Sequence, residues 1–328
     1  MQRRIADWQG PAIGLGCMNL SHAYGTPPAP ADAAELLLRA HELGVRHFDT
    51  AALYGFGRNE ELVGKVLKPL RGEIFLASKC GMTGVDGKRV IDGRPETLTA
   101  TLEEALRRLQ TDHIDLYYLH RWDKSVPIED SVGTMARMVE QGKIGAIGLS
   151  EVSADTLRKA HSVHPIAAVQ TEYSLWTRNP EIALLDTCRE LGAALVAFSP
   201  LARGFLAGSV TDPEALEPGD IRRNMPRFQS PHFALNCRLR DDFRELAAEA
   251  GCTMSQLALC WLLEQDPCVI PIPGTRSLAH LEENLAAASV GVSEDILVKA
   301  SQLIGPNTVS GPRYGAATQA EIDTEDYV

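Results

Sequence analysis

The sequence has few of the features that mark membrane, secreted or nucleic-acid-binding proteins. No apolar run approaches the roughly 18 residues of a membrane span, and Met1–Gly10 is not followed by the apolar stretch of a signal peptide. Positive charge is in deficit, because 32 Lys and Arg stand against 43 Asp and Glu, for a formal net charge of −11. We therefore expect no membrane partner and no nucleic acid bound through overall charge. The net charge does not exclude a local basic pocket.

Cysteines are few and lack the spacing of a metal site or a disulfide framework. There are seven, an odd number, and no Cys-x-x-Cys occurs. A chain of 328 residues buries about three quarters of its unfolded surface, so its core needs no covalent staple. We therefore expect reduced thiols, no metal and a cytoplasmic location.

Short apolar runs alternate with amphipathic runs along the chain, and the two kinds predict strands and helices. The expected strands are 12–17, 45–50, 73–79, 114–120, 144–150, 167–172, 194–199 and 269–272. The expected helices are 32–43, 59–67, 95–109, 128–140, 153–161, 181–191, 239–250, 253–264, 278–288 and 293–303. Eight strand-then-helix units predict an α/β fold, a single (β/α)8 TIM barrel with extra helices over residues 1–328, rather than an open doubly wound sheet.

One long irregular stretch, Pro200–Asn236, follows the seventh strand and is rich in proline. A loop of this length is usually functional or disordered. The tail from Gly305 contains Gly, Pro and Thr and ends in an acidic segment. Loop and tail are therefore candidates for a lid over the barrel mouth.

Polar side chains follow the expected strands, at the end where a barrel carries its chemistry. Asp49 and Lys79 end neighbouring strands and carry opposite charges, so we expect them to pair, because a buried charge needs a partner. Tyr54 lies in the loop after Asp49, and His120 ends the fourth strand. These four residues form the candidate catalytic group.

Together these side chains suit a general acid for an oxygen that gains negative charge. A buried ammonium beside a tyrosine stabilises the phenolate and lowers its pKa, while a carboxylate holds the ammonium in place. A neutral histidine orients the substrate oxygen. A carbonyl that receives hydride is such an oxygen, and only a nicotinamide would supply the hydride. The alternative is a structural salt bridge, a loop aromatic and a packed core histidine.

The same residues resemble the aldo-keto reductase superfamily over nearly the whole chain. The similarity lies in Asp49-Thr50-Ala51-x-x-Tyr54-Gly55, in Ser78-Lys79 and in Tyr118-Leu119-His120-Arg121-Trp122-Asp123. The resemblance implies that Tyr54 donates the proton, that Asp49 and Lys79 tune it, and that His120 orients the carbonyl. It also implies that a nicotinamide dinucleotide lies across the mouth of the barrel.

The resemblance, rather than a dinucleotide fingerprint, implies the cofactor site, because both Gly-x-Gly segments lack the third glycine. Ser150 and Gln170 would hold the carboxamide, and Phe198 would stack on the nicotinamide unless it only packs in the core. The pyrophosphate would be wrapped by Ser199, Pro200, Leu201, Arg203 and Gly204. The adenosine end would be bound by Gly274, Thr275, Arg276, His280, Glu283 and Asn284. The role of Glu151, where the family often has Asn, stays open.

Arg276 favours NADP(H) over NAD(H), because a guanidinium binds a phosphate through two parallel hydrogen bonds. The alternative is a solvated surface charge. Tyr24, Trp122 and Trp176 are the candidate substrate-binding residues, since aromatic walls suit apolar or aromatic carbonyl compounds. Each is equally compatible with packing.

The predicted function is NADP(H)-dependent reduction of a small aldehyde or ketone to an alcohol, or the reverse reaction. The alternative is a nucleotide-sensing regulatory subunit that resembles the potassium channel beta subunits, which share this barrel and these four residues. The natural carbonyl compound, the preferred direction and the oligomeric state are left open by the sequence.

Overall fold

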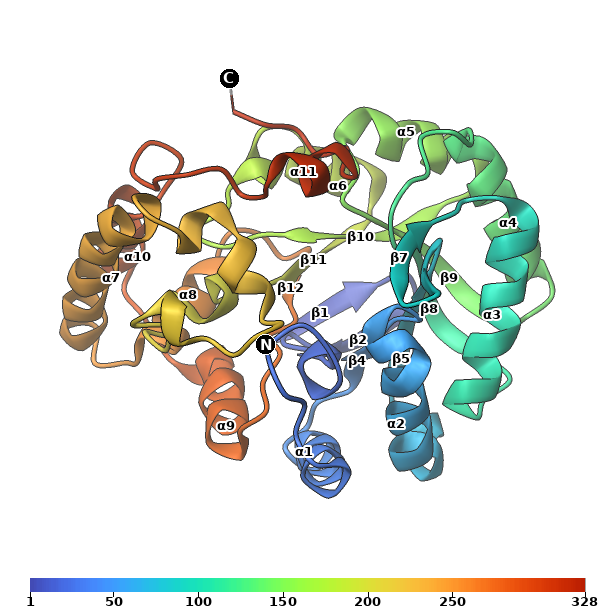
Figure 1. The fold of residues 1–328 in the computed structure, drawn as a ribbon, viewed down its shortest axis with the longest axis horizontal. Coiled ribbons are helices and arrows are strands. Elements are labelled where there is room, and N and C mark those ends of the chain that lie inside the picture. The colour runs from blue at the N-terminus through green and yellow to red at the C-terminus, as the bar shows by residue number, and fades with distance from the viewer. Residues whose placement is uncertain (328) are drawn as a thin grey trace.

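The computed structural model describes residues 1–327, and its centre is one curled sheet of eight parallel strands. In spatial order the strands are β3 (Leu15–Gly16), β4 (His47–Asp49), β5 (Phe75–Cys80), β8 (Ile114–Leu119), β9 (Ile144–Ser150), β10 (Ile166–Glu172), β11 (Ala194–Phe198) and β12 (Val269–Pro271). The Gly14 N–H donates to the Pro271 carbonyl at 3.0 Å, which brings the first and last strands together. The predicted (β/α)8 barrel is therefore confirmed (Figure 1).

Helices ring the strands on the outside, as Figure 1 shows. They are α1 (Pro30–Glu42), α2 (Arg58–Leu67), α3 (Pro95–Leu109), α4 (Ile128–Glu140), α5 (Ala154–Val163), α6 (Leu184–Leu191), α7 (His232–Glu249), α8 (Met254–Leu263), α9 (Leu278–Ala286), α10 (Glu294–Leu303) and α11 (Ala316–Ala320). The bounds of α3 and α4 match the prediction, because their apolar periodicity is clear and α3 begins at a proline.

The loop after β11 is shorter than predicted. Helix α7 begins at His232, seven residues before the expected start, so the irregular stretch ends at Pro231. The first turns of α7 have little apolar periodicity, so the sequence pattern did not predict them as helix. The loop itself contains short 3₁₀ turns, among them Ala202–Gly204 and Ile221–Asn224.

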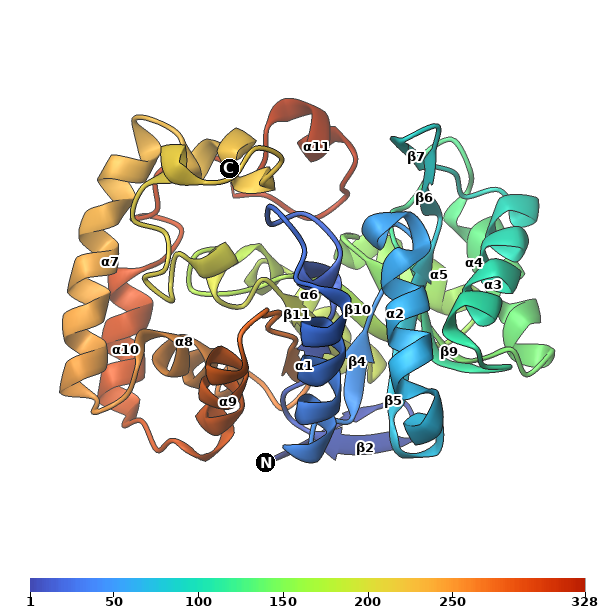
Figure 2. The ribbon, with the colours of Figure 1, turned by 60° about the horizontal axis from the view of Figure 1, so that its bottom comes forward.

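Two hairpins that the sequence did not predict close the barrel and extend its mouth. Strands β1 (Gln2–Ile5) and β2 (Trp8–Pro11) pair antiparallel, and Ile5 packs into the barrel interior while Trp8 stacks on Phe75 with ring centres 4.5 Å apart. Strands β6 (Met82–Val85) and β7 (Lys88–Ile91) form the second hairpin. Figure 2 shows β2 at one end of the molecule, with β6, β7 and α11 at the other.

The described residues carry neither a metal cluster nor a single membrane-length helix. No group of three or more His, Cys, Asp or Glu side chains within 1–327 is placed to hold a metal ion. Only α7 and α8 together reach the length and composition of a span, and they are bent by 83°. The seven cysteines are free thiols.

Candidate active site

A cavity of about 810 Å³ opens where the parallel strands end. Of the residues predicted for the site, its walls include Tyr24, Asp49, Tyr54, His120, Ser150, Gln170, Phe198, Ser199, Pro200, Leu201, Arg203, Gly204, Gly274, Thr275, Arg276, His280, Glu283 and Asn284. Lys79 lies behind this wall and is fully buried. The register of the barrel thus gathers residues that are up to 260 positions apart, such as Tyr24 and Asn284, because the carboxyl ends of parallel strands meet at one face.

Asp49 and Lys79 form the buried ion pair that the sequence predicted. Lys79 Nζ contacts Asp49 Oδ1 and also donates to the Thr50 carbonyl at 2.8 Å. The second carboxylate oxygen, Asp49 Oδ2, accepts from Gln170 Nε2 at 2.7 Å. Both buried charges are therefore compensated, and the ammonium is fixed in direction.

Tyr54 and His120 meet in front of this ion pair. Lys79 Nζ lies 4.9 Å from the centre of the Tyr54 ring. The His120 ring stands edge-on to Tyr54, with ring centres 5.7 Å apart and an angle of 87° between planes. Tyr54 opens a tight turn in which Gly55, Phe56 and Gly57 all have positive φ, and this turn aims the phenol into the cavity.

Burial decides the protonation of these groups. It raises the pKa of Tyr54 above its ordinary value, and Lys79 opposes this shift without overcoming it. Lys79 thus acts on this pKa in the predicted direction, but burial outweighs it and Asp49 adds to the rise, so the net shift is upward rather than downward. Burial alone would lower the pKa of Lys79, but Asp49 and Tyr54 outweigh it and the pKa is raised.

His120 is a neutral imidazole. Burial, and then the positive charges of Arg121 and Lys79, hold its pKa well below the usual range. Its Nδ1 is buried and has no hydrogen-bond partner among residues 1–327. A neutral ring at the cavity wall suits hydrogen bonding to an uncharged carbonyl oxygen.

The loop after β11 holds its backbone in an uncommon conformation beside Phe198. Ser199, Ala202 and Arg203 have φ of 49°, 50° and 58°, and Gly204 follows at 91°. Non-glycine residues with positive φ cost roughly 1–2 kcal/mol each, and such strain clusters at functional sites. Where a left-handed residue adjoins a right-handed one, as at Gly204 and Phe205, successive backbone N–H groups point toward one side, which favours anions.

The adjacent wall, formed by the segment after β12, fits the phosphate end of a dinucleotide. Ser277 caps α9 by accepting from the His280 N–H at 3.4 Å, so the positive end of the helix dipole faces this part of the cavity. Arg276 donates only to the Thr26 carbonyl, at 2.8 Å, and has no carboxylate partner within residues 1–327. Asn284 Oδ1 is buried without a hydrogen-bond partner in the same described part of the chain. A Cβ on Gly274 would lie 2.9 Å from the Gly16 carbonyl, so only glycine fits there.

Two predicted substrate-binding residues, Trp122 and Trp176, do not line this cavity. The Trp122 indole donates to the Val126 carbonyl at 2.9 Å and packs on the core outside the barrel. Trp176 is buried and stacks on Phe205, with ring centres 4.1 Å apart. Trp176 is thus part of the core and Trp122 is half-buried against it, so neither indole reaches the cavity in this structure. Tyr24 does line the cavity.

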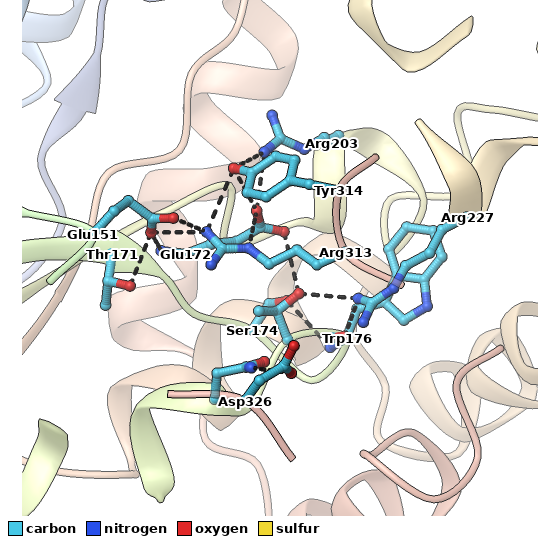
Figure 3. A network of polar contacts seen from close by, with 12 residues as sticks. Glu151, Thr171, Glu172, Ser174, Trp176, Arg203, Arg227, Arg313, Tyr314 and Asp326 are labelled. Atoms are coloured by element: carbon cyan, nitrogen blue, oxygen red, sulfur yellow. Dashed lines mark hydrogen bonds and ion pairs between the residues drawn. The ribbon is translucent and has the colours of Figure 1, made fainter. Parts of the chain in front are cut away.

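Glu151 belongs to a buried ion network beside the cavity (Figure 3). Arg313, from the tail, contacts Glu151 Oε2 at 2.6 Å and Glu172 Oε2 at 2.9 Å. Arg203 Nη2 donates to Glu172 Oε2 at 2.9 Å and to the Tyr314 hydroxyl at 3.1 Å. Despite burial, these arginines lower the pKa of Glu172 to about 2. Arg203, predicted at the pyrophosphate, thus also anchors the tail.

Several lining residues were missed by the sequence analysis. They are His22, Leu53, Met82, Arg89, Arg121 and Arg222, among others. Arg121 directly follows His120 at the end of a strand, and this position could have predicted that it lines the cavity. Arg89 and Met82 lie in the unpredicted β6–β7 hairpin, and no local pattern in the sequence pointed to them.

Comparison with known proteins gives consistent matches. A family model described as the aldo/keto reductase family matches residues 12–300. The chain is 42% identical over 305 residues to a probable aldo-keto reductase 1 from Glycine max, covering 92% of this chain and 88% of that one. It is 40% identical over 331 residues to an aldo-keto reductase named with NADP(+) from Schizosaccharomyces pombe, covering 98% and 97%.

Among solved structures, a glycerol dehydrogenase from Gluconobacter oxydans superposes with a TM-score of 0.84. It is 29% identical, and the match covers 95% of this chain and 97% of that chain. A thermostable aldo-keto reductase in complex with the inhibitor epalrestat superposes with a TM-score of 0.74 at 31% identity, over 92% and 99%. The fold and the sequence therefore match the same group of enzymes.

Proposed function

The chain belongs to the aldo/keto reductase family and is an oxidoreductase, and from this premise we propose that it transfers hydride between NADP(H) and an aldehyde or ketone. The observation that carries the proposal is the buried group of Asp49, Lys79, Tyr54 and His120 at the wall of a cavity. The NADP(+) in the name of the Schizosaccharomyces pombe relative supports the choice of cofactor.

The side chains divide the work of reduction. Bound NADPH supplies the hydride. Tyr54 donates its hydroxyl proton to the carbonyl oxygen as negative charge develops there, and Lys79 stabilises the phenolate that remains. Asp49 keeps the ammonium in place, and neutral His120 hydrogen-bonds the same oxygen. Ser150, Gln170 and Phe198 would hold the nicotinamide end, and Arg276 with the start of α9 would hold the phosphate of the adenosine end.

Tyr54→Phe tests the assigned acid. We expect NADPH affinity within about twofold of wild type, since the ring remains, and a loss of turnover of roughly 100-fold or more, because positioned general acids contribute 10²–10⁴-fold. The measurement is NADPH oxidation against a panel of aldehydes and ketones, with cofactor fluorescence for binding. Tyr327→Phe, on the surface, is the matched control. Near-normal turnover in Tyr54→Phe would refute the role, and NADPH binding by the wild type with no turnover of any carbonyl would favour a nucleotide-sensing subunit.

A further inference from the structure

Most guanidinium groups in the cavity wall are neutralised by carboxylates. The arginines that line it are Arg89, Arg121, Arg203, Arg222 and Arg276. Arg89 pairs with Glu321, Arg203 with Glu172, and Arg222 with Asp220. Within residues 1–327, Arg121 and Arg276 have no carboxylate partner. Arg276 follows β12 and Arg121 follows β8, with β9, β10 and β11 between them, so the adenosine end of a dinucleotide does not account for Arg121.

The Arg121 guanidinium has N–H donors that no acceptor within residues 1–327 uses. Its Nη1 donates to the His120 carbonyl at 2.7 Å and to Ser150 Oγ at 3.3 Å. Its Nε and Nη2 make no hydrogen bond to any residue from 1 to 327. The side chain is half-buried, and Glu151, the acidic residue next to Ser150, is already paired with Arg313. A guanidinium offers five donors in a planar fork that matches a carboxylate or phosphate.

The surroundings of Arg121 define one end of a binding site. Tyr54 and His120 lie at the carbonyl position, and Leu53 and Met82 pack with Tyr54 in a small apolar cluster that also lines the cavity. The same cavity wall therefore presents proton donors, apolar side chains and a guanidinium that has no carboxylate in salt-bridge contact within residues 1–327. In a protein of net charge −11, anions are not attracted by the overall field, so a local cation of this kind has to act through direct contact.

We propose that the substrate carries a carboxylate or phosphate group besides its carbonyl, and that Arg121 binds this anion while Tyr54 and His120 bind the carbonyl oxygen. The inference rests on the proposed function and names the substrate class for the same site. Binding of the anion at Arg121 raises kcat/KM for an anionic carbonyl compound over a neutral compound of the same shape.

Matched substrates test the proposal by turnover. The set is 4-carboxybenzaldehyde, its methyl ester and 4-formylphenyl phosphate, each with NADPH. We expect wild type to prefer an anionic member over the ester by about tenfold or more in kcat/KM, and the better anion assigns carboxylate or phosphate. Arg121→Gln should remove this preference by slowing the anionic substrate alone. Arg158→Gln, which makes the same charge change on the exposed face of α5 where Arg158 pairs with Glu190, should keep it.

A binding experiment separates this inference from the proposed function. Benzoate, phenyl phosphate and neutral benzamide are titrated into wild type and Arg121→Gln by calorimetry. If either anion binds better than benzamide, and Arg121→Gln removes this difference, the anion site is supported. This holds even if the enzyme turns over no carbonyl compound, because missing turnover would contradict the proposed function alone. Two results would overturn the inference: benzamide and both anions bind equally, or Arg121→Gln lowers kcat/KM equally for all three aldehyde substrates. Arg121 would then be a positioning residue for His120 and Ser150.

Discussion

At the scale of single residues, burial governs charge more strongly than the nearest neighbour does. Tyr54 and His120 both lie within reach of Lys79, yet burial is the larger influence on each of their pKa values. Tyr54 therefore stays protonated and able to donate, and His120 stays neutral. Lys79 is the exception because its carboxylate partner is in direct contact. The protonation states that reduction needs are thus present at neutral pH.

His47 gives a pH-dependent prediction of stability. Its ring is fully buried between Trp8 and Phe75, and burial lowers its pKa to about 4. An unfolded histidine takes up a proton near pH 6.5, so stability is complete above that pH and falls as pH drops toward 4. The loss amounts to about 3 kcal/mol, from 1.36 kcal/mol per pKa unit.

We expect His47→Phe to flatten this part of the pH profile, whatever its stability at pH 7. Urea unfolding at several pH values between 7 and 4 measures the slope. His164→Phe, at a half-exposed histidine after α5, should keep the wild-type slope. Identical slopes for wild type and His47→Phe would show that this ring is not the titrating group.

Arg276 gives a prediction of cofactor selectivity. Its guanidinium is free of carboxylates within the described residues and lies next to the start of α9. Arg276→Ala should weaken NADPH about tenfold or more and NADH little, because only NADPH carries the 2′-phosphate. Dissociation constants of both nucleotides measure this effect. The NADPH dissociation constant of Arg276→Lys should lie between those of the wild type and Arg276→Ala. Equal loss for the two nucleotides would remove the argument for the phosphate.

At the scale of elements, the tail is part of the active end of the barrel. Tyr314 lines the cavity, and Asp323 accepts from the Ser153 N–H at 3.2 Å and from Thr156 Oγ1 at 2.7 Å at the start of α5. Arg313 joins the tail to β9 and β10 through Glu151 and Glu172. The segment from 311 to 327 is therefore held by the buried ion pairs of Arg313, by hydrogen bonds to Asp323 and by the buried side chain of Ile322.

Arg313→Ala should destabilise the protein by about 3–5 kcal/mol at pH 7, because it leaves buried Glu151 without an ion-pair partner and leaves Glu172 with Arg203 alone. The folded pKa of Glu172, about 2, lies below its unfolded value, so the stability it contributes is present above roughly pH 4.5 and is lost toward pH 2. The difference between wild type and Arg313→Ala should accordingly shrink on acidification.

Urea unfolding at pH 7 and at about pH 3, between the folded and unfolded pKa values of Glu172, provides the measurement. Arg313→Lys should recover only part of the loss, since an ammonium does not reproduce the planar fork that contacts both carboxylates. A change below about 1 kcal/mol at pH 7 would mean that the network adds little to the stability of the fold.

At the scale of the whole molecule, stability and chemistry lie at opposite ends of the barrel. The β1–β2 hairpin closes one end, and Ile5 is buried among interior residues of β5, β8 and β11. The tail lies at the other end, as the positions of β2 and α11 show in Figure 2, and Tyr314 and Thr318 of the tail line the cavity. Barrel enzymes commonly separate the two properties in this way.

Ile5→Ala should therefore lower the free energy of unfolding by about 2–5 kcal/mol and leave kcat/KM within about twofold of wild type. Ile5→Val, which removes one methylene, should cost about 0.5–1.5 kcal/mol. Urea unfolding and NADPH oxidation on the same preparations measure both. A large fall in kcat/KM of the fully folded variant would show that the two ends are coupled.

The sequence by itself determined the alternation of strands and helices, the barrel, and the residues Asp49, Tyr54, Lys79 and His120 at the strand ends. These follow from local patterns, because each strand or helix has its own apolar period and each strand end is marked by a polar residue. The sequence did not predict the hairpins β1–β2 and β6–β7, because their strands are short and their faces are polar.

Only the tertiary structure decided which side chains share a surface. It turned Trp122 and Trp176 into the core, joined Glu151 to Arg313 across 162 positions, and left Arg121 in the cavity without a carboxylate. It also set the direction of the pKa shift of Tyr54. Such properties depend on burial and on contacts between distant segments, and no local spacing in a sequence encodes them.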